Sequence, residues 1–220
     1  MRRTNARDAV KILRRAGVTV VPMRYESGPY AGKTWRDVGW ECRPYTDLKG
    51  ILWHHDASPE GDSGGCKLDA KGFGVQPTGA LWWCMYGAFG VPPAAAAWVD
   101  RRGVWYVYAA LVTNHAGLGY WPSIGRDNGN AHLFGIETDH RDGESWPDAQ
   151  IDSLRLGTAA LLKAWGVDPN VGLLGHKEWA PGRKSDPDGL DMAVERRRVT
   201  RLLATVPSGW RALLDKWLRR

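Results

Sequence analysis

The sequence predicts an α/β fold in which a single mixed β-sheet is flanked by helices. Three short apolar runs have the length and composition of buried strands, at residues 50–53, 133–138 and 171–174. Two further apolar runs, 95–99 and 104–111, flank the polar turn Asp100–Gly103, which indicates a β-hairpin. Segments 146–165 and 189–204 carry apolar residues at helical spacing, so we expect two amphipathic helices on the sheet.

The first elements are expected to be a helix and a strand. Asn5 can cap a helix whose apolar residues recur up to Leu13, and Gly17 is expected to end it. Val18–Val21 then has the composition of a strand. Two later stretches are rich in Gly and lack a sustained period, so we expect irregular structure at residues 22–49 and 56–80.

The later helices have recognisable boundaries. Ser145 and Pro147 favour a helix start, and Gly166 favours its end. Pro207 and Gly209 break the last helix, which leaves a short helix or the start of a linker at the end of the chain. We therefore divide the chain into an N-terminal extension packed on the main domain, the main domain itself and a basic tail, at residues 1–47, 48–205 and 206–220.

Composition excludes several classes of protein. Of the 220 residues, 43% are apolar and 25% are charged, which is the ordinary globular balance and excludes a fully disordered chain. No run reaches the roughly 18 consecutive apolar residues of a membrane helix. The basic start Met1–Asn5 leads into a charged segment without the apolar core of a secretory signal. We expect a protein that is made in the cytoplasm without a signal peptide.

The positive charge is concentrated near the end of the chain. Residues 195–220 carry eight basic and two acidic residues, a net charge of +6 that equals that of the whole chain. Such a segment suits a polyanion, although the solvated face of an amphipathic helix would have the same pattern. Only Trp210 and Trp217 accompany these charges, so we do not expect nucleic-acid binding. The odd number of cysteines argues against a disulfide scaffold, although a single disulfide, Cys66–Cys84, is possible.

Metal-ligating residue types follow two of the predicted strands. His54 follows the run 50–53, His176 follows the run 171–174, and Asp186 lies ten residues further on. Two imidazoles and a carboxylate with an open fourth position form a catalytic zinc set, although isolated histidines are more often hydrogen-bonded structural residues. His55 is an alternative to His54 as the ligand. Adjacent strand residues point to opposite faces, so only one of the two can face the metal. His132 and His140 flank a strand and are expected at the surface.

Four segments give the sequence a specific resemblance. They are Leu52–Ser58, Asn114–Gly117, Gly135–Glu137 and the run His176–Pro187, which contains Ala-Pro-Gly-Arg-Lys followed by Ser-Asp-Pro. In order and spacing they resemble the N-acetylmuramoyl-L-alanine amidase type 2 family, which includes phage lysozyme-like amidases and peptidoglycan recognition proteins. The resemblance covers residues 48–204 and implies a peptidoglycan recognition protein-like amidase fold.

The resemblance also implies roles for individual residues. The matching zinc ligands are His54, His176 and Asp186. Lys184 matches a lysine that stabilises the oxyanion, and Glu137 matches a strand glutamate that acts as general base in part of the family. His115 matches a histidine of the substrate groove, and we assign its neighbour Asn114 and the ligand-strand residue Trp53 to substrate binding as well. Further aromatic side chains that are expected to stack on glycan or peptide are Trp82, Trp83, Trp98 and Trp121.

The function implied by the resemblance is zinc-dependent hydrolysis of the amide between N-acetylmuramic acid and L-alanine in peptidoglycan. A non-catalytic peptidoglycan-binding module and a zinc peptidase of the stem peptide are the alternatives. Together with the basic tail, the resemblance suggests a monomeric phage endolysin that acts on the cell wall, with anionic wall polymers as possible partners. A cytoplasmic or prophage-borne amidase is the alternative.

Overall fold

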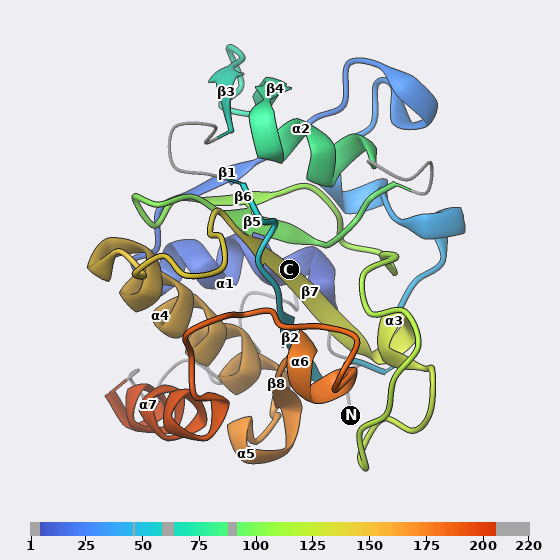
Figure 1. Cartoon of the computed structure of the whole chain (residues 1–220). Coiled ribbons are helices and arrows are strands. Elements are labelled where there is room, and N and C mark those ends of the chain that lie inside the picture. The colour runs from blue at the N-terminus through green and yellow to red at the C-terminus, as the bar shows by residue number, and fades with distance from the viewer. Residues whose placement is uncertain (1–4, 46, 59–63, 88–91, 206–220) are drawn as a thin grey trace.

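The computed structural model describes residues 5–45, 47–58, 64–87 and 92–205. At its centre is a six-stranded sheet with the order β1-β6-β5-β7-β2-β8 (Figure 1). Its strands are β1 (Val20–Pro22), β2 (Gly50–Trp53), β5 (Ala97–Val99), β6 (Trp105–Val107), β7 (Leu133–Thr138) and β8 (Leu173–Gly175). Strands β5 and β6 are antiparallel, and every other neighbouring pair is parallel. The predicted mixed sheet is confirmed.

Strand β2 lies in the middle of the parallel part of the sheet, between β7 and β8. All four of its residues are buried, as expected for a parallel strand that is covered on both faces. Ile51 and Trp53 belong to the core on one face of the sheet, whereas Leu52 belongs to the core on the other face. This alternation decides which face the residues that follow β2 can reach.

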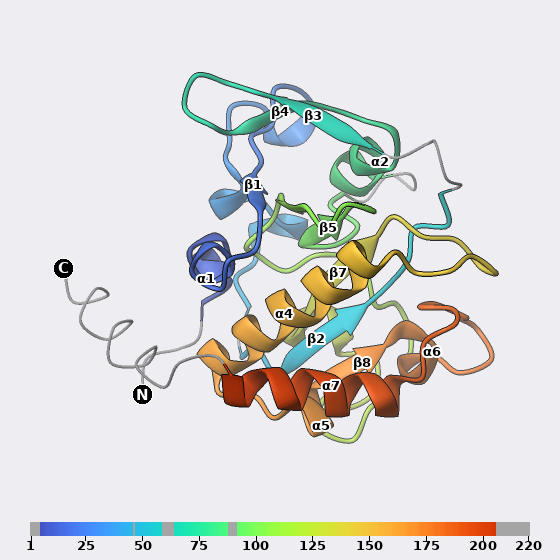
Figure 2. The ribbon, with the colours of Figure 1, turned by 90° about the vertical axis from the view of Figure 1, so that its left-hand side faces the viewer.

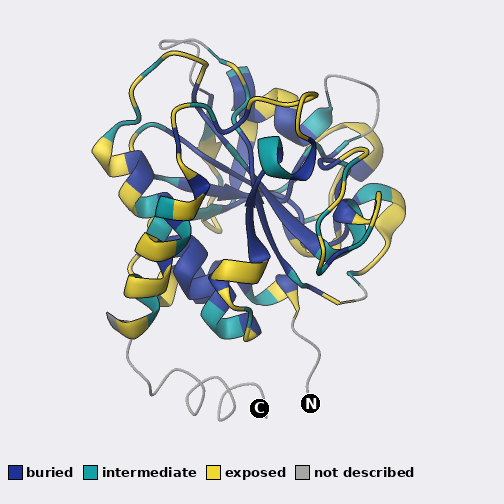
Figure 3. Ribbon diagram, turned by 60° about the horizontal axis from the view of Figure 1, so that its bottom comes forward, coloured by how far each residue is buried: buried dark blue, intermediate teal, exposed yellow. Residues whose placement is uncertain are grey.

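Three helices cover one face of the sheet: α1 (Ala9–Arg15), α4 (Asp148–Trp165) and α7 (Met192–Thr205) (Figure 2). The close approach of α4 depends on Gly157, because a Cβ there would lie 2.4 Å from the ring of Trp105. Helix α4 ends at Gly166, whose φ of 69° suits a glycine. Figure 3 shows buried residues along the sheet and exposed residues on the outer turns of the helices.

The opposite face contains structure that the sequence did not predict. Helix α2 (Gly79–Tyr86) covers β5 and β6, and a separate hairpin is formed by β3 (Gly65–Leu68) and β4 (Gly74–Thr78). Most of this structure falls in residues 56–80, which we expected to be irregular. Short 3-10 helices also occur within 22–49, at Gly28–Tyr30, Trp35–Asp37 and Trp40–Cys42.

The predicted hairpin is confirmed, and several boundaries shift. The carboxylate of Asp100 accepts hydrogen bonds from the backbone N–H groups of Arg102 and Val104, which fixes the turn between β5 and β6. Strand β8 begins at Leu173 rather than at residue 171, because α5 (Pro169–Gly172) precedes it. The remaining short helices are α3 (Gly129–His132) and α6 (His176–Trp179).

Strand β1 pairs with β6 at the edge of the main sheet, and α1 contacts α4, so residues 5–22 are continuous with the central fold. All three cysteines are free, so the disulfide between Cys66 and Cys84 that the sequence allowed is not formed. In the described ranges, no helix has the length and apolar character needed to cross a membrane. The basic tail predicted at 206–220 lies outside the described residues.

Candidate metal centre

Three side chains meet at the edge of the sheet where β2 and β8 end. These two strands are parallel neighbours, so His54, which follows β2, and His176, which follows β8, leave the sheet at the same edge. Asp186 reaches them from the loop that follows α6. All three residues are buried, with exposed fractions of 1%, 2% and 6% in the order given.

The ligand atoms of this group are close enough to share one ion. The Nδ1 atoms of His54 and His176 are 2.9 Å apart, and Oδ2 of Asp186 is 3.2 Å from the first and 3.0 Å from the second. A tetrahedral zinc ion with bonds of about 2.0–2.1 Å separates its ligand atoms by about 3.3 Å. The group therefore has the size of a three-ligand zinc site.

Hydrogen bonds on the outer nitrogens fix the tautomers of His54 and His176. Nε2 of His176 is 3.0 Å from the carbonyl oxygen of Ala116, to which it must donate. Nε2 of His115 donates to the carbonyl oxygen of Leu133 at 3.0 Å, so its Nδ1 is free to accept from Nε2 of His54, also at 3.0 Å. Burial, and next the neighbouring His176, lowers the pKa of His54 to about 4, which keeps it neutral.

As a result, three lone pairs converge on one point without a proton between them. In the neutral tautomers that these hydrogen bonds favour, the inward Nδ1 atoms of His54 and His176 each direct a lone pair toward the carboxylate of Asp186. Buried like this, the three groups repel one another unless a cation lies among them. The donor set thus fits a divalent metal ion such as zinc.

His115 lies behind His54 instead of lining an open groove. Its side chain is 9% exposed, and its ring rests on Gly135, where a Cβ would come within 2.6 Å of its Cγ. Asn130 holds the adjoining turn, because its Oδ1 accepts from the backbone N–H groups of His115 and Ala116. His115 is therefore placed to orient the ring of His54.

Replacement of His115 by Phe should weaken zinc binding by about 10–100-fold, the usual cost of losing a hydrogen-bond partner of a metal-ligating histidine. Phe fills similar space but cannot accept the proton on Nε2 of His54, so the ligand is no longer held. Zinc affinity can be measured by competition with a chromophoric chelator. Unchanged affinity would show that His54 orients itself without this partner.

Glu137 approaches the group from the neighbouring strand β7. Its Oε2 is buried and has no hydrogen-bond partner among the described residues. Burial raises the pKa of Glu137 well above its usual range, the charges of Asp56 and Asp186 raise it further, and the ammonium of Lys184 lowers it. Lys184 itself is exposed on the loop that carries Asp186. A carboxylate with one buried oxygen that lacks a partner among the described residues is suited to accept a proton.

Other expected site residues lie elsewhere. Trp53 is fully buried on the α4 side of the sheet, where its Nε1 donates to Oγ1 of Thr158, so it packs in the core. Oδ1 of Asn114 accepts from Nδ2 of Asn130 and thereby supports the turn at His115. His55 points away from the metal group and contacts Asp142, as alternation along the strand requires.

Asp56 is a neighbour of the site that the sequence analysis did not single out. Its carboxylate accepts hydrogen bonds from Nε1 of Trp98 and from the backbone N–H of Ser58. Burial raises its pKa to about 6, and its charge acts on Glu137. Its position directly after the two histidines is the only sequence signal that could have indicated it.

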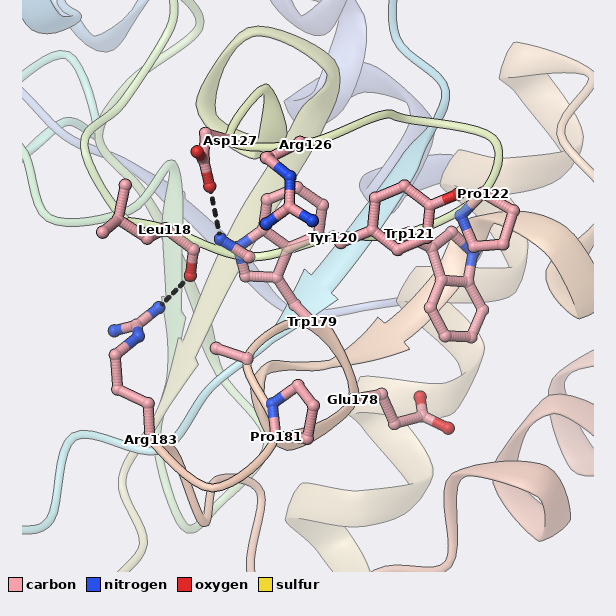
Figure 4. Close-up of a pocket in the computed structure, with 12 residues that line it drawn as sticks. Leu118, Tyr120, Trp121, Pro122, Arg126, Asp127, Glu178, Trp179, Pro181 and Arg183 are labelled. Carbon is pink, nitrogen blue, oxygen red and sulfur yellow. Dashed lines mark hydrogen bonds between the residues drawn. The ribbon is translucent and has the colours of Figure 1, made fainter.

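A pocket of about 630 Å³ lies beyond α6 (Figure 4). Its walls are the segment Leu118–Asp127 and the turn Glu178–Arg183. Tyr120 and Trp121 supply aromatic surface, and the charged residues of the lining are two cations, Arg126 and Arg183, and two acids, Asp127 and Glu178. Arg183 donates to the carbonyl oxygen of Ala116, the same atom that accepts from His176, so the pocket adjoins the metal group.

Comparisons with known proteins agree with this geometry. The pattern of the N-acetylmuramoyl-L-alanine amidase family matches residues 44–189. The 1,6-anhydro-N-acetylmuramyl-L-alanine amidase AmpD of Escherichia coli (strain K12) is 30% identical over 150 residues, which cover 67% of this chain and 80% of that protein.

Solved structures share the fold. A selenomethionine derivative of AmpD aligns with a TM-score of 0.52 at 23% identity, over 84% of this chain and 94% of that one. The endolysin amidase LysCS of Clostridium intestinale URNW aligns with a TM-score of 0.51 at 14% identity, over 83% and 95% of the two chains. The family match and the fold together show that this chain is an amidase of the N-acetylmuramoyl-L-alanine amidase family.

Proposed function

We propose that the protein uses zinc to hydrolyse the amide between N-acetylmuramic acid and L-alanine in peptidoglycan, with His54, His176 and Asp186 as the metal ligands. The observation that carries this proposal is the convergence of three buried lone pairs. A bound zinc ion supplies Lewis acidity, which makes water a better nucleophile and an amide carbonyl a better electrophile at neutral pH.

Glu137 is the proposed general base. It accepts a proton from the attacking water and passes it to the amide nitrogen as L-alanine leaves. Its raised pKa suits both halves of this task, because the group must first take up a proton and then give it away. Without a competing hydrogen bond, Oε2 is free to face the water.

Lys184 is the proposed oxyanion donor. Its charge lowers the pKa of both Glu137 and His54, and it lies two residues before Asp186 on the same loop. There it can stabilise the negative charge that develops on the carbonyl oxygen during attack. Exposure leaves this flexible side chain free to approach the substrate.

The pocket beside α6 is the proposed place for part of the muramyl peptide. Carboxylates of a stem peptide suit the two cations Arg126 and Arg183, and aromatic walls suit apolar portions of a peptide or sugar ring. Trp82 and Trp83 on α2 are 42% and 53% exposed and remain available for glycan contacts. Trp98 is fully buried and cannot serve in that way.

The two alternative functions are less well supported. A pure binding module has no need for a carboxylate oxygen that is buried, lacks a partner among the described residues and interacts electrostatically with Asp186. A stem-peptide zinc peptidase would use the same chemistry on a different bond. The family match over residues 44–189 favours the muramoyl–alanine amide.

Fragments released from purified peptidoglycan test this proposal. We expect free lactyl groups on the muramic acid residues and new L-alanine amino termini, detected by mass spectrometry, with loss of both signals after chelation. New termini within the peptide would identify a peptidase instead. Digestion of intact wall beside soluble anhydromuropeptide separates an endolysin, our proposal for the biological setting, from an enzyme restricted to soluble fragments.

A further inference from the structure

His55 joins the two chain segments that carry the metal ligands His54 and Asp186. Its side chain is 5% exposed, and the alternation of Leu52 and Trp53 between the two faces of the sheet puts it on the face opposite to His54. Nδ1 of His55 accepts a hydrogen bond of 3.3 Å from the backbone N–H of Asp188, which lies two residues beyond Asp186. One imidazole thus connects the end of β2 directly to the ligand loop.

The second ring nitrogen of His55 extends this connection to another loop. Because Nδ1 accepts from the backbone, Nε2 carries the proton and donates to Oδ1 of Asp142 at 3.1 Å. Asp142 lies in the loop between β7 and α4, whose Gly143 N–H donates to Oδ2 of Asp188 at 2.8 Å. Oγ of Ser185, the residue before Asp186, is 3.4 Å from Asp142. The ligand loop is therefore held on both sides of Asp186.

Two aromatic rings extend the contacts on this side. His140, which we expected at the surface, is fully buried and lies 5.7 Å from the ring of His55. The ring of His140 stacks nearly parallel on the ring of Trp146, with 3.9 Å between the ring centroids. Nε1 of Trp146 donates to the carbonyl oxygen of Asp188 at 2.9 Å, so both backbone groups of Asp188 are bonded to this cluster.

This arrangement meets a need that is specific to the third ligand. His54 and His176 directly follow strands, which fix their positions, whereas Asp186 lies in a loop whose residues 181–185 are exposed. A loop ligand that is not held in place loses conformational entropy when a metal ion binds, and this weakens binding.

We propose that His55 is a positioning residue that holds the Asp186 segment against the end of β2, so that the third ligand is in place before a metal ion arrives. The inference rests on the proposed zinc site. His55 contacts neither metal nor substrate and acts only through Asp188 and Asp142.

Zinc affinity, measured by chelator competition on the full chain, tests the proposal. His55→Phe should bind zinc about 10–100-fold more weakly, comparable to the loss of other outer hydrogen-bond partners of a metal site. His55→Asn should recover part of the affinity, because its Oδ1 can take the place of Nδ1 and accept from Asp188. Turnover at saturating zinc should stay near that of the wild type. His132→Phe is the matched control, because the ring of His132 bonds to the carbonyl oxygen of Asp47 at the other end of β7.

Asp142→Ala keeps the test decisive if His55→Phe does not fold, since the Asp142 side chain is 61% exposed and its loss should spare the fold. Weaker zinc binding by this variant supports the proposal. Wild-type affinity in His55→Phe, or in Asp142→Ala when the Phe variant is unfolded, overturns it. Failure of the wild-type protein to bind zinc would instead refute the proposed function, which separates the two ideas.

Discussion

Asp186→Ala should abolish tight zinc binding and lower amidase turnover by on the order of 10³-fold or more. The metal contributes several kcal/mol of transition-state stabilisation, and each 1.36 kcal/mol is a factor of ten in rate. Two imidazoles alone leave the proposed set one ligand short.

The fold should survive this substitution. His54 and His176 keep their outer hydrogen bonds to His115 and Ala116, and the substitution removes a buried carboxylate that is unfavourable without a cation. Metal analysis checks the loss of zinc, and the melting temperature of the chelated protein checks that the fold is retained. Added zinc should restore the chelated wild type but not the variant. Full activity in Asp186→Ala would rule out the ligand assignment.

Glu137→Gln should lower turnover by about 10²–10⁴-fold while zinc affinity stays unchanged. Gln keeps the size of the side chain but cannot accept a proton from water. Burial raises the pKa of Glu137, so the reactive carboxylate form is lost as the pH falls through that raised value. The wild type should therefore lose activity toward acidic pH, and the variant should lack this part of the profile.

Rates measured across pH on zinc-saturated protein, together with chelator competition, test the assignment. Lys184→Ala provides a comparison at the same site, because it removes a charge but no proton acceptor. It should keep an acidic limb in the profile, moved to higher pH because the ammonium that lowers the pKa of Glu137 is gone. A Glu137→Gln variant with wild-type turnover, or with an unchanged acidic limb, would transfer the role of base to another group such as Asp56.

Residues at strand ends were the predictable part of the metal centre. The apolar run before His54 indicates a buried strand, and a histidine directly after such a strand must lie at the sheet edge. Asp186 follows no strand, so only its match to a family motif indicated its place. Alternation along β2 did not decide whether His54 or His55 faces the metal group. The burial of Leu52 and Trp53 on opposite faces of the sheet explains why it is His54.

The missed elements lack periodic signals. Helix α2 has the sequence Gly-Ala-Leu-Trp-Trp-Cys-Met-Tyr, which is apolar on every side and gives no amphipathic pattern. The place of His115 depends on His54 and Leu133, which are distant in sequence, so local rules cannot supply it. Helix α5 was missed too, because residues 171–174 were interpreted as a strand, although Asp168 caps Asn170 and Pro169 occupies the first turn.

Gly135 sets a limit on how stable the centre of the sheet can become. In the middle of β7 a β-branched residue is normally preferred, and glycine costs about 0.5–1 kcal/mol relative to alanine. Yet any side chain at Gly135 would collide with the ring of His115, which holds His54. Attempts to make this enzyme more heat-resistant should therefore leave β7 alone and use solvent-facing positions of α4 and α7, where gains in stability do not compete with the geometry of the metal centre.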